Sequence, residues 1–147
     1  MLSKNVQTKH LQMIGLILLI SLVIVACGNQ QSDQSITEID WQWSEMVETA
    51  PASQSIVPNP ENYTLLLSSD GSLNIKADCN MVQGFYIIDG SALTLEQGPS
   101  TMAFCGEESL DLLFLGFLGN IESFSIENEQ LVLELKDGAR RMTFKEG

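Results

Sequence analysis

The sequence predicts an α+β domain in which antiparallel β-strands form a sheet and one α-helix packs against it. Apolar and polar residues alternate with a period of two through residues 63–79, 85–96 and 123–144, which is typical of strands with one buried face. An Asp-Gly pair interrupts each of these stretches and favours a tight hairpin turn. One further stretch, residues 106–120, has apolar residues spaced three and four apart, which indicates a helix.

The first 26 residues are not expected to belong to this domain. Lys4 and Lys9 precede an uncharged apolar run that has the length of a signal-peptide core and is too short to span a bilayer comfortably. The run ends in IVAC, which resembles the lipobox of bacterial lipoproteins. That resemblance implies a lipoprotein signal peptide over residues 1–26 and acylation of the Cys27 sulfur. An uncleaved anchor with a chance cysteine is the alternative.

The segment after the lipidation site is polar. Residues 27–40 contain few apolar side chains and predict a lipid-anchored tether, so the domain is expected to span residues 41–147. Three of the four prolines lie within residues 48–62, which predicts an irregular loop there.

The register of the first hairpin follows from its apolar pattern. A two-residue turn would place Leu67 opposite Asn74, whereas a three-residue loop ending at Gly71 pairs Leu67 with Leu73 and keeps one face apolar. We therefore expect the second register. It also places Cys79 on the buried face of the second strand.

Two more hairpins are expected farther along the chain. The second Asp-Gly pair should place Tyr86 opposite Leu95. The third should place Glu134 opposite Arg141 on the outer face, a cross-strand ion pair worth about 0.2–1 kcal/mol.

The helix is expected to begin near Glu107, because the carboxylates of Glu107, Glu108 and Asp111 favour a helix N-terminus, and to end near Gly119. These three carboxylates are interpreted as a solvated helix start rather than a calcium site, since they lack the alternating ligands of a dedicated loop. The expected buried face consists of Leu110, Leu113, Phe114 and Phe117. Leu112, Leu115 and Leu118 widen it, so the helix should be buried against the sheet.

Composition argues against several classes of function. The chain has 19 acidic and seven basic side chains, and loss of residues 1–26 would leave five basic ones and a net charge of −14. Such a domain repels phosphate backbones, so no nucleic-acid partner is expected. The single histidine, His10, would be lost with the signal peptide, which removes the commonest general base and transition-metal ligand. We therefore expect no enzyme activity, no metal and no cofactor, although a Ser–Lys arrangement using Lys76 stays open.

Two cysteines remain once Cys27 is assigned to the lipid. An exported compartment is oxidising, so a Cys79–Cys105 disulfide is expected, with two unpaired thiols as the alternative. Zinc binding and cysteine catalysis are disfavoured because no histidine and no C-x-x-C spacing accompany them. The disulfide would stabilise the fold by about 3.5 kcal/mol in the chain-entropy account.

Taken together, these segments resemble the META domain, the HslJ-like family of bacterial proteins. The resemblance covers about residues 41–145, and its most specific parts are Cys79-Asn80, Gly84, Tyr86, and Thr101 four residues before Cys105. Asp78 departs from the pattern, which often has glycine there, as does the Ala103–Phe104 pair. The family implies an antiparallel sheet curled into an open half-barrel with one helix packed across it. It supplies no catalytic residues.

Three aromatic residues are candidates for ligand contact. Trp41 and Trp43 should share one strand face, where they either pack in the core or form an exposed platform for a peptide, sugar or lipid chain. Tyr86 is the third candidate. Asn80 is interpreted as a cap on a turn or bulge, with substrate binding as the alternative.

The sequence thus predicts a non-enzymatic lipoprotein of the cell envelope, held by its acyl chains on the exported face of a membrane. That face is the periplasmic side of the outer membrane if the cell has one, and otherwise the outer cell surface. The family resemblance implies a role in stress tolerance, which we expect to be binding or structural support, with an apolar groove of the curled sheet accepting a peptide or lipid. An inhibitor or accessory subunit that docks on an envelope enzyme is the alternative.

Overall fold

The computed structural model describes residues 35–147. The predicted signal peptide and the Cys27 lipidation site lie outside the described residues. Within residues 35–147, no helix has the length and apolar character needed to cross a membrane.

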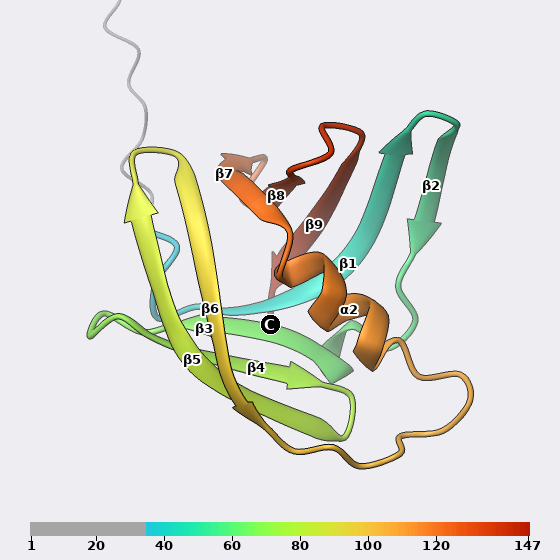
Figure 1. Ribbon diagram of the computed structural model, residues 1–147. Coiled ribbons are helices and arrows are strands. Elements are labelled where there is room, and N and C mark those ends of the chain that lie inside the picture. Colours follow the sequence, from blue (N-terminus) through green and yellow to red (C-terminus); the bar gives the residue numbers. More distant parts are fainter. Residues whose placement is uncertain (1–34) are drawn as a thin grey trace, which may run out of the picture. The chain divides into compact units, whose positions relative to one another are not determined.

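The described chain forms nine strands, one 3-10 turn and one α-helix (Figure 1). In chain order these elements are β1 (Asp40–Thr49), β2 (Ala52–Ile56), η1 (Pro60–Asn62), β3 (Tyr63–Leu67), β4 (Ser72–Ala77), β5 (Asn80–Asp89), β6 (Ala92–Ser100), α2 (Asp111–Leu118), β7 (Ile121–Glu127), β8 (Gln130–Leu135) and β9 (Arg140–Glu146).

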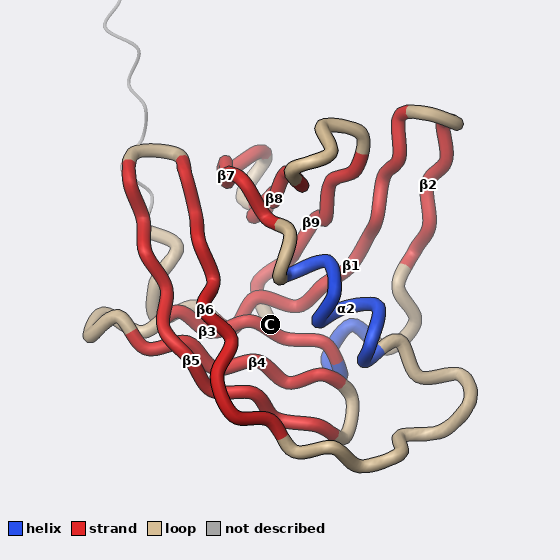
Figure 2. Tube along the Cα trace, viewed as in Figure 1, coloured by secondary structure: helices blue, strands red, loops and turns tan. Residues whose placement is uncertain are grey.

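The strands form one antiparallel sheet that curls into a near-ring. Its order is β2-β1-β3-β4-β5-β6-β7-β8-β9, and β9 pairs back with β1 over the length of both strands (Figure 2). The weakest junction lies between β6 and β7, which share the single pair Ala92 and Ser123. The predicted α+β class, with a curled sheet and one packed helix, is confirmed. The sheet curls farther than the half-barrel expected, because β1 pairs with both β3 and β9.

The interior of the ring is filled by aromatic and aliphatic side chains. Phe114 of α2 stacks on Trp43 with ring centroids 5.3 Å apart. It forms a T-shaped pair with Tyr63 at 5.7 Å and a tilted pair with Phe144 at 6.2 Å. Burial of side chains of this size contributes about 1.5–3 kcal/mol each. The apolar face of the curled sheet is therefore core, and the expectation that it lines an open binding groove is wrong.

The predicted registers of the three hairpins are confirmed. Leu67 pairs with Leu73, Tyr86 with Leu95, and Glu134 with Arg141. Gly71 ends the first loop with a φ of +87°, and Arg141 lies 3.8 Å from the Glu134 carboxylate.

The prediction that Cys79 faces inward is wrong. β4 ends at Ala77, and Asp78 adopts a left-handed φ of +58°, so the chain reverses within two residues and Ala77 pairs with Asn80. Cys79 therefore lies exposed in the turn, and Asn80 takes the next inward position. Strand alternation could not be carried past Ala77 because the strand itself stops there.

The helix starts later than predicted. Gly106, with a φ of +106°, bends the chain, and α2 begins at Asp111, so Glu107 and Glu108 lie in the preceding loop. Phe114 and Leu118 are buried as an apolar face requires, but Leu112 and Leu113 point outward. Only eight residues are helical, so the helix covers the ring with one narrow side and leaves the opposite side exposed.

Two boundaries near the start of the domain also differ from the prediction. Ile36 is buried in the core and its carbonyl accepts a hydrogen bond from the Trp41 indole, so the packed chain begins before residue 41. The proline-rich segment is not an irregular loop throughout, because β2 pairs with β1 from Ala52 to Ile56. The prolines flank that strand, at Pro51 and Pro58, and leave its interior able to pair.

Close approach of β5 and β6 explains one residue of the family pattern. A Cβ atom on Gly84 would lie 2.0 Å from the main-chain oxygen of Glu96, and one on Gly98 would lie 2.7 Å from that of Gln83. Only residues without a side chain fit at this crossing, which directs the end of β6 toward the loop that precedes α2.

Candidate functional site

The candidate site is the corner where the β4–β5 turn meets the loop between β6 and α2, residues 101–110. A disulfide joins Cys79 in the turn to Cys105 in the loop, with Cα atoms 5.6 Å apart, as the sequence predicted. The Cys79 N–H also donates to the Cys105 sulfur at 3.3 Å. The loop is thus covalently fixed to the sheet at one point.

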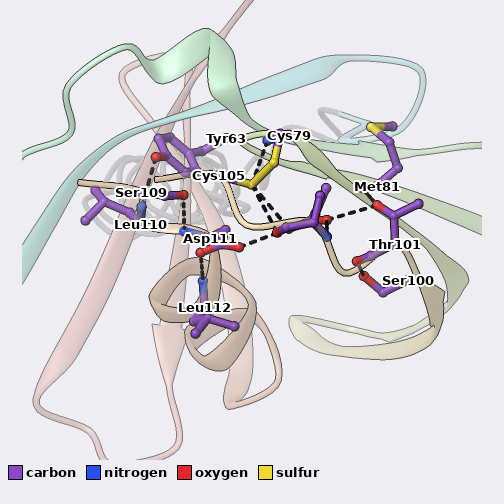
Figure 3. Close-up of a disulfide and its surroundings, with 12 residues drawn as sticks. Tyr63, Cys79, Met81, Ser100, Thr101, Cys105, Ser109, Leu110, Asp111 and Leu112 are labelled. Atoms are coloured by element: carbon purple, nitrogen blue, oxygen red, sulfur yellow. Dashed lines mark hydrogen bonds between the residues drawn. A yellow bond between two sulfur atoms is a disulfide. The ribbon is translucent and has the colours of Figure 1, made fainter. Parts of the chain in front are cut away.

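Asn80 fixes the same loop through its side chain. Figure 3 shows this corner, with the disulfide between Cys79 and Cys105 close to Asp111. Its amide nitrogen donates to the Ala103 carbonyl at 3.0 Å, and its amide oxygen accepts from the Ala103 N–H at 2.8 Å. The carboxamide therefore pairs with Ala103 as a neighbouring strand would. The oxygen also accepts from the Thr101 hydroxyl at 3.1 Å.

The same amide nitrogen reaches the start of the helix. It donates to a carboxylate oxygen of Asp111 at 3.0 Å, while the Leu110 N–H donates to the Tyr63 hydroxyl at 3.0 Å. Asn80 is 4 % exposed, so its full hydrogen-bonding capacity is used inside the protein. The prediction that Asn80 caps a turn or bulge is wrong, because its side-chain hydrogen bonds run to residues 101–111 and none runs to the turn.

An apolar groove of about 600 Å³ lies between this loop and the first turn of α2. Asn80 and Asp111 lie at its polar part, and Leu115 contributes to its wall. Three large apolar side chains around it are almost fully in solvent: Met102 at 94 %, Phe104 at 84 % and Leu112 at 80 % exposed. We call this feature the corner groove.

A second, acidic hollow of about 430 Å³ adjoins the corner groove and shares Cys105, Gly106, Glu107 and Ser109 with it. Its carboxylates belong to Asp78, Glu107 and Glu108. Within residues 35–147, none of these carboxylates forms an ion pair; the pairs found there join Arg140 to Asp137 and Arg141 to Glu127 and Glu134. The corner thus combines exposed apolar side chains with carboxylates that form no ion pair within residues 35–147.

Of the basic residues of the described chain, Lys76 lies nearest to the acidic hollow, because the Asn62 side chain that it contacts lines that hollow. Lys76 donates to the Glu61 carbonyl and to the Asn62 side chain, and the other four belong to the β8–β9 hairpin and its turn: Lys136, Arg140, Arg141 and Lys145. In residues 35–147 no group of three histidine, cysteine or carboxylate side chains is placed to hold a metal ion.

The three predicted ligand-contact residues do not line the corner groove. Trp41 and Trp43 share one face, as expected, but are 3 % and 1 % exposed, so the exposed-platform interpretation is wrong. The Tyr86 hydroxyl donates to the Ser68 carbonyl at 2.8 Å. Burial raises the pKa of Tyr86, with smaller contributions from the charges of Asp70 and Glu38, and its role is packing at the other end of the first hairpin.

Sequence reasoning missed Met102, Phe104 and Leu112 as site residues. The alternation in the sequence was a usable signal for Met102 and Phe104. These two residues alternate with Thr101, Ala103 and Cys105, which are fixed to Asn80 by hydrogen bonds or to Cys79 by the disulfide. Leu112 could not be distinguished from the buried leucines of the helix, because the predicted helix began too early and the residue at which α2 starts decides which leucines face outward.

Comparisons with known proteins agree with this architecture. The family model described as the META domain matches residues 34–147. Among solved structures, an NMR structure of a protein from Burkholderia xenovorans is 22 % identical, with a TM-score of 0.59, and the match covers 76 % of this chain and 83 % of that one.

A crystal structure of a DUF4847-family protein from Bacteroides vulgatus is 10 % identical with a TM-score of 0.55, and the match covers 72 % of this chain and 90 % of that one. A comparison with curated proteins gave no match. The structural similarities therefore support the fold alone.

Proposed function

The chain belongs to the META domain family, and on that premise we propose that it is a non-enzymatic, lipid-anchored protein of the cell envelope that binds a partner through the corner groove. The anchor is the acylated Cys27 implied by the lipobox resemblance. The process served is stress tolerance, to which the family resemblance points.

The observation that carries this proposal is the exposure of Met102, Phe104 and Leu112 around one groove. Large apolar side chains gathered on the surface of a small domain are a usual mark of an interaction site. Met102 and Phe104 lie on a loop that is fixed by the disulfide and by Asn80, and Leu112 lies in the first turn of α2. A preformed surface loses less conformational entropy on binding than a mobile one.

The polar groups at the groove support binding rather than catalysis. The Asn80 carboxamide donates to an Asp111 oxygen, and its other hydrogen bonds go to Thr101, Ala103 and the Cys105 sulfur. The Ser109 hydroxyl accepts from the Asp111 N–H, and Ser100 donates to a neighbouring carbonyl. These groups position the main chain, and none of them pairs a nucleophile with a base.

An inhibitor or accessory subunit that docks on an envelope enzyme is the second candidate. The acidic hollow lined by Asp78, Glu107 and Glu108 favours it, because three clustered carboxylates attract a basic protein surface toward the corner.

Site-specific photo-crosslinking in intact cells tests the proposal. A photoreactive residue at position 112 should give a discrete adduct, and one at position 56 should not, although Ile56 is also highly exposed, at 73 %. The adduct should disappear when Met102 and Phe104 are replaced by serine. Equal crosslinking from both positions, or none from position 112, would contradict binding at the groove.

A further inference from the structure

We propose that the occupant of the corner groove is an extended, cationic peptide segment, and this inference rests on the binding function proposed above. The segment pairs with the main chain around Met102 and Phe104, places an apolar side chain in the groove, and directs a lysine or arginine toward Asp78, Glu107 and Glu108.

The main chain of residues 101–105 provides the first argument. The Thr101 N–H donates to the Met81 carbonyl, and both main-chain groups of Ala103 bond to the Asn80 carboxamide. In contrast, no hydrogen bond within residues 35–147 involves the main-chain N–H or C=O of Met102 or Phe104. A rigid segment with alternate donors and acceptors unpaired is the arrangement that strand addition by a peptide uses.

The spacing of the exposed side chains provides the second argument. Met102 and Phe104 are two residues apart and flank the groove, whose far side is formed by Leu112 and Leu115. An extended peptide also presents alternate side chains on one side, so an apolar residue can enter between these walls while its neighbours stay in solvent. A volume of about 600 Å³ accommodates such a side chain together with part of the peptide main chain.

Charge provides the third argument and sets the sign of the partner. The carboxylates of Asp78, Glu107 and Glu108 line a hollow that shares Cys105 and Gly106 with the corner groove. A peptide in the groove therefore has these carboxylates within reach of a long side chain. A basic side chain is attracted there, and an acidic one is repelled.

A fatty acyl chain fits the same groove less well. It carries no group that can pair with the main chain of Met102 and Phe104. Free fatty acids and anionic lipid headgroups also bring negative charge to a corner that is already negative. The polar and charged surroundings of the apolar walls thus favour a peptide.

Fluorescence anisotropy on the full chain in phosphatidylcholine nanodiscs tests this inference. The probe is a labelled nine-residue peptide, blocked at both ends, in which valine and lysine alternate. One control peptide has glutamate in place of lysine, and another has N-methyl groups on alternate main-chain nitrogens. Palmitate serves as the acyl competitor. The lysine peptide should bind, and both control peptides should bind at least about tenfold more weakly.

Matched variants locate the interaction. Replacing Glu107 and Glu108 by glutamine should weaken lysine-peptide binding by about three- to tenfold at low salt, and less in high salt, because exposed ion pairs are screened. The same replacement at the exposed Glu122 and Glu129, which follow α2 in the sequence and do not line either the corner groove or the acidic hollow, should change the affinity less than about twofold. All four positions are exposed, so folding should be retained, and circular dichroism checks it.

The outcomes separate this inference from the function on which it rests. Equal binding of lysine and glutamate peptides, undiminished binding of the N-methylated peptide, or displacement by palmitate without an effect of the Glu107 and Glu108 replacements would overturn the peptide assignment. In those cases, a loss of binding in Leu112→Ser but not in Ile56→Ser would still support binding at the groove. If Leu112→Ser changes neither the binding of the peptides nor the binding of palmitate, both the peptide assignment and the binding function of the groove are wrong.

Discussion

Replacement of Asn80 by alanine should be among the most destabilising single changes in this domain. Its side chain makes four hydrogen bonds with nitrogen or oxygen atoms, two with Ala103, one with Thr101 and one with Asp111, at 2.8 to 3.1 Å. Its amide nitrogen also donates a weaker hydrogen bond to the Cys105 sulfur at 3.3 Å. At a net contribution of about 0.5–1.5 kcal/mol per bond, four bonds correspond to about 2–6 kcal/mol. Ala103 and Thr101 are exposed and can bond to water after the replacement, so we expect about 3 kcal/mol.

Urea unfolding of the oxidised protein measures this loss, and Asn74→Ala is the matched control. Asn74 lies on the outward side of β4, and no hydrogen bond of its side chain occurs within residues 35–147. Its replacement should change the free energy of unfolding by less than about 0.5 kcal/mol. A loss below about 1 kcal/mol for Asn80→Ala would refute the view that the Asn80 carboxamide holds the loop.

The variant Asn80→Asp adds a test by pH. It keeps the acceptor for Ala103 but loses the donor, and it places a second carboxylate against Asp111. The deficit relative to the wild type should therefore be largest at neutral pH. It should begin to shrink above the ordinary aspartate pKa of about 4 as pH falls, because burial and the neighbouring carboxylate raise the pKa of the new carboxyl, and a protonated carboxyl can donate again. A deficit that does not vary with pH would contradict the Asn80–Asp111 contact.

Other predictions concern the anchor, the disulfide and the sheet. Palmitate labelling of the cells should disappear in Cys27→Ser, and label that persists would exclude the anchor. Cys105→Ser should lower the free energy of unfolding by about 3.5 kcal/mol, and free thiols in the native protein on mass mapping would contradict the disulfide. Gly84→Ala should cost about 1–3 kcal/mol, because its Cβ would lie 2.0 Å from a main-chain oxygen; an unchanged urea midpoint would show that β5 and β6 separate easily. Hydrogen bonds from the Ala139 main chain and the Arg140 side chain lower the pKa of Asp137 in the folded protein. The ionised Asp137 therefore stabilises the fold at pH values above its unfolded-state pKa, and this stabilisation is lost as pH falls through the lower folded-state pKa. An NMR titration in which this carboxyl behaves as an ordinary aspartate would disprove it.

Sequence reasoning was most successful where a periodic pattern and a specific turn agreed. The Leu67–Leu73 register followed from the apolar face and the Gly71 loop together, and the structure has that register. The same logic placed Glu134 opposite Arg141. Local information was sufficient in these cases because hairpin partners are close in sequence.

The errors arose where tertiary contacts decide the outcome. Extending the alternation of apolar and polar residues past Ala77 places Cys79 on the buried face, but Asp78 has a left-handed conformation and β4 ends at Ala77. Asn80 could be recognised as a turn residue, but nothing in its neighbourhood indicated bonds to Ala103, which is 23 residues away. The closing of the ring by β1 and β9 joins the two ends of the domain and has no local signal.

The candidate site was missed for a related reason. Trp43 is a ligand-contact candidate from the sequence because exposed aromatic rings often bind ligands, but its ring is buried in the core against Phe114. The exposed apolar residues Met102 and Leu112 could be distinguished from core residues only after the loop and the helix start were placed.

The most direct test of the account is to map, by two-dimensional NMR of the 15N-labelled full chain in nanodiscs, which amide signals move when the lysine-containing peptide is added. If the peptide binds in the corner groove, the changes should be confined to residues 78–82 and 101–115, at the corner where the disulfide and Asn80 fix the loop. Changes centred on the exposed edge strand β2, or spread evenly over the sheet, would contradict it.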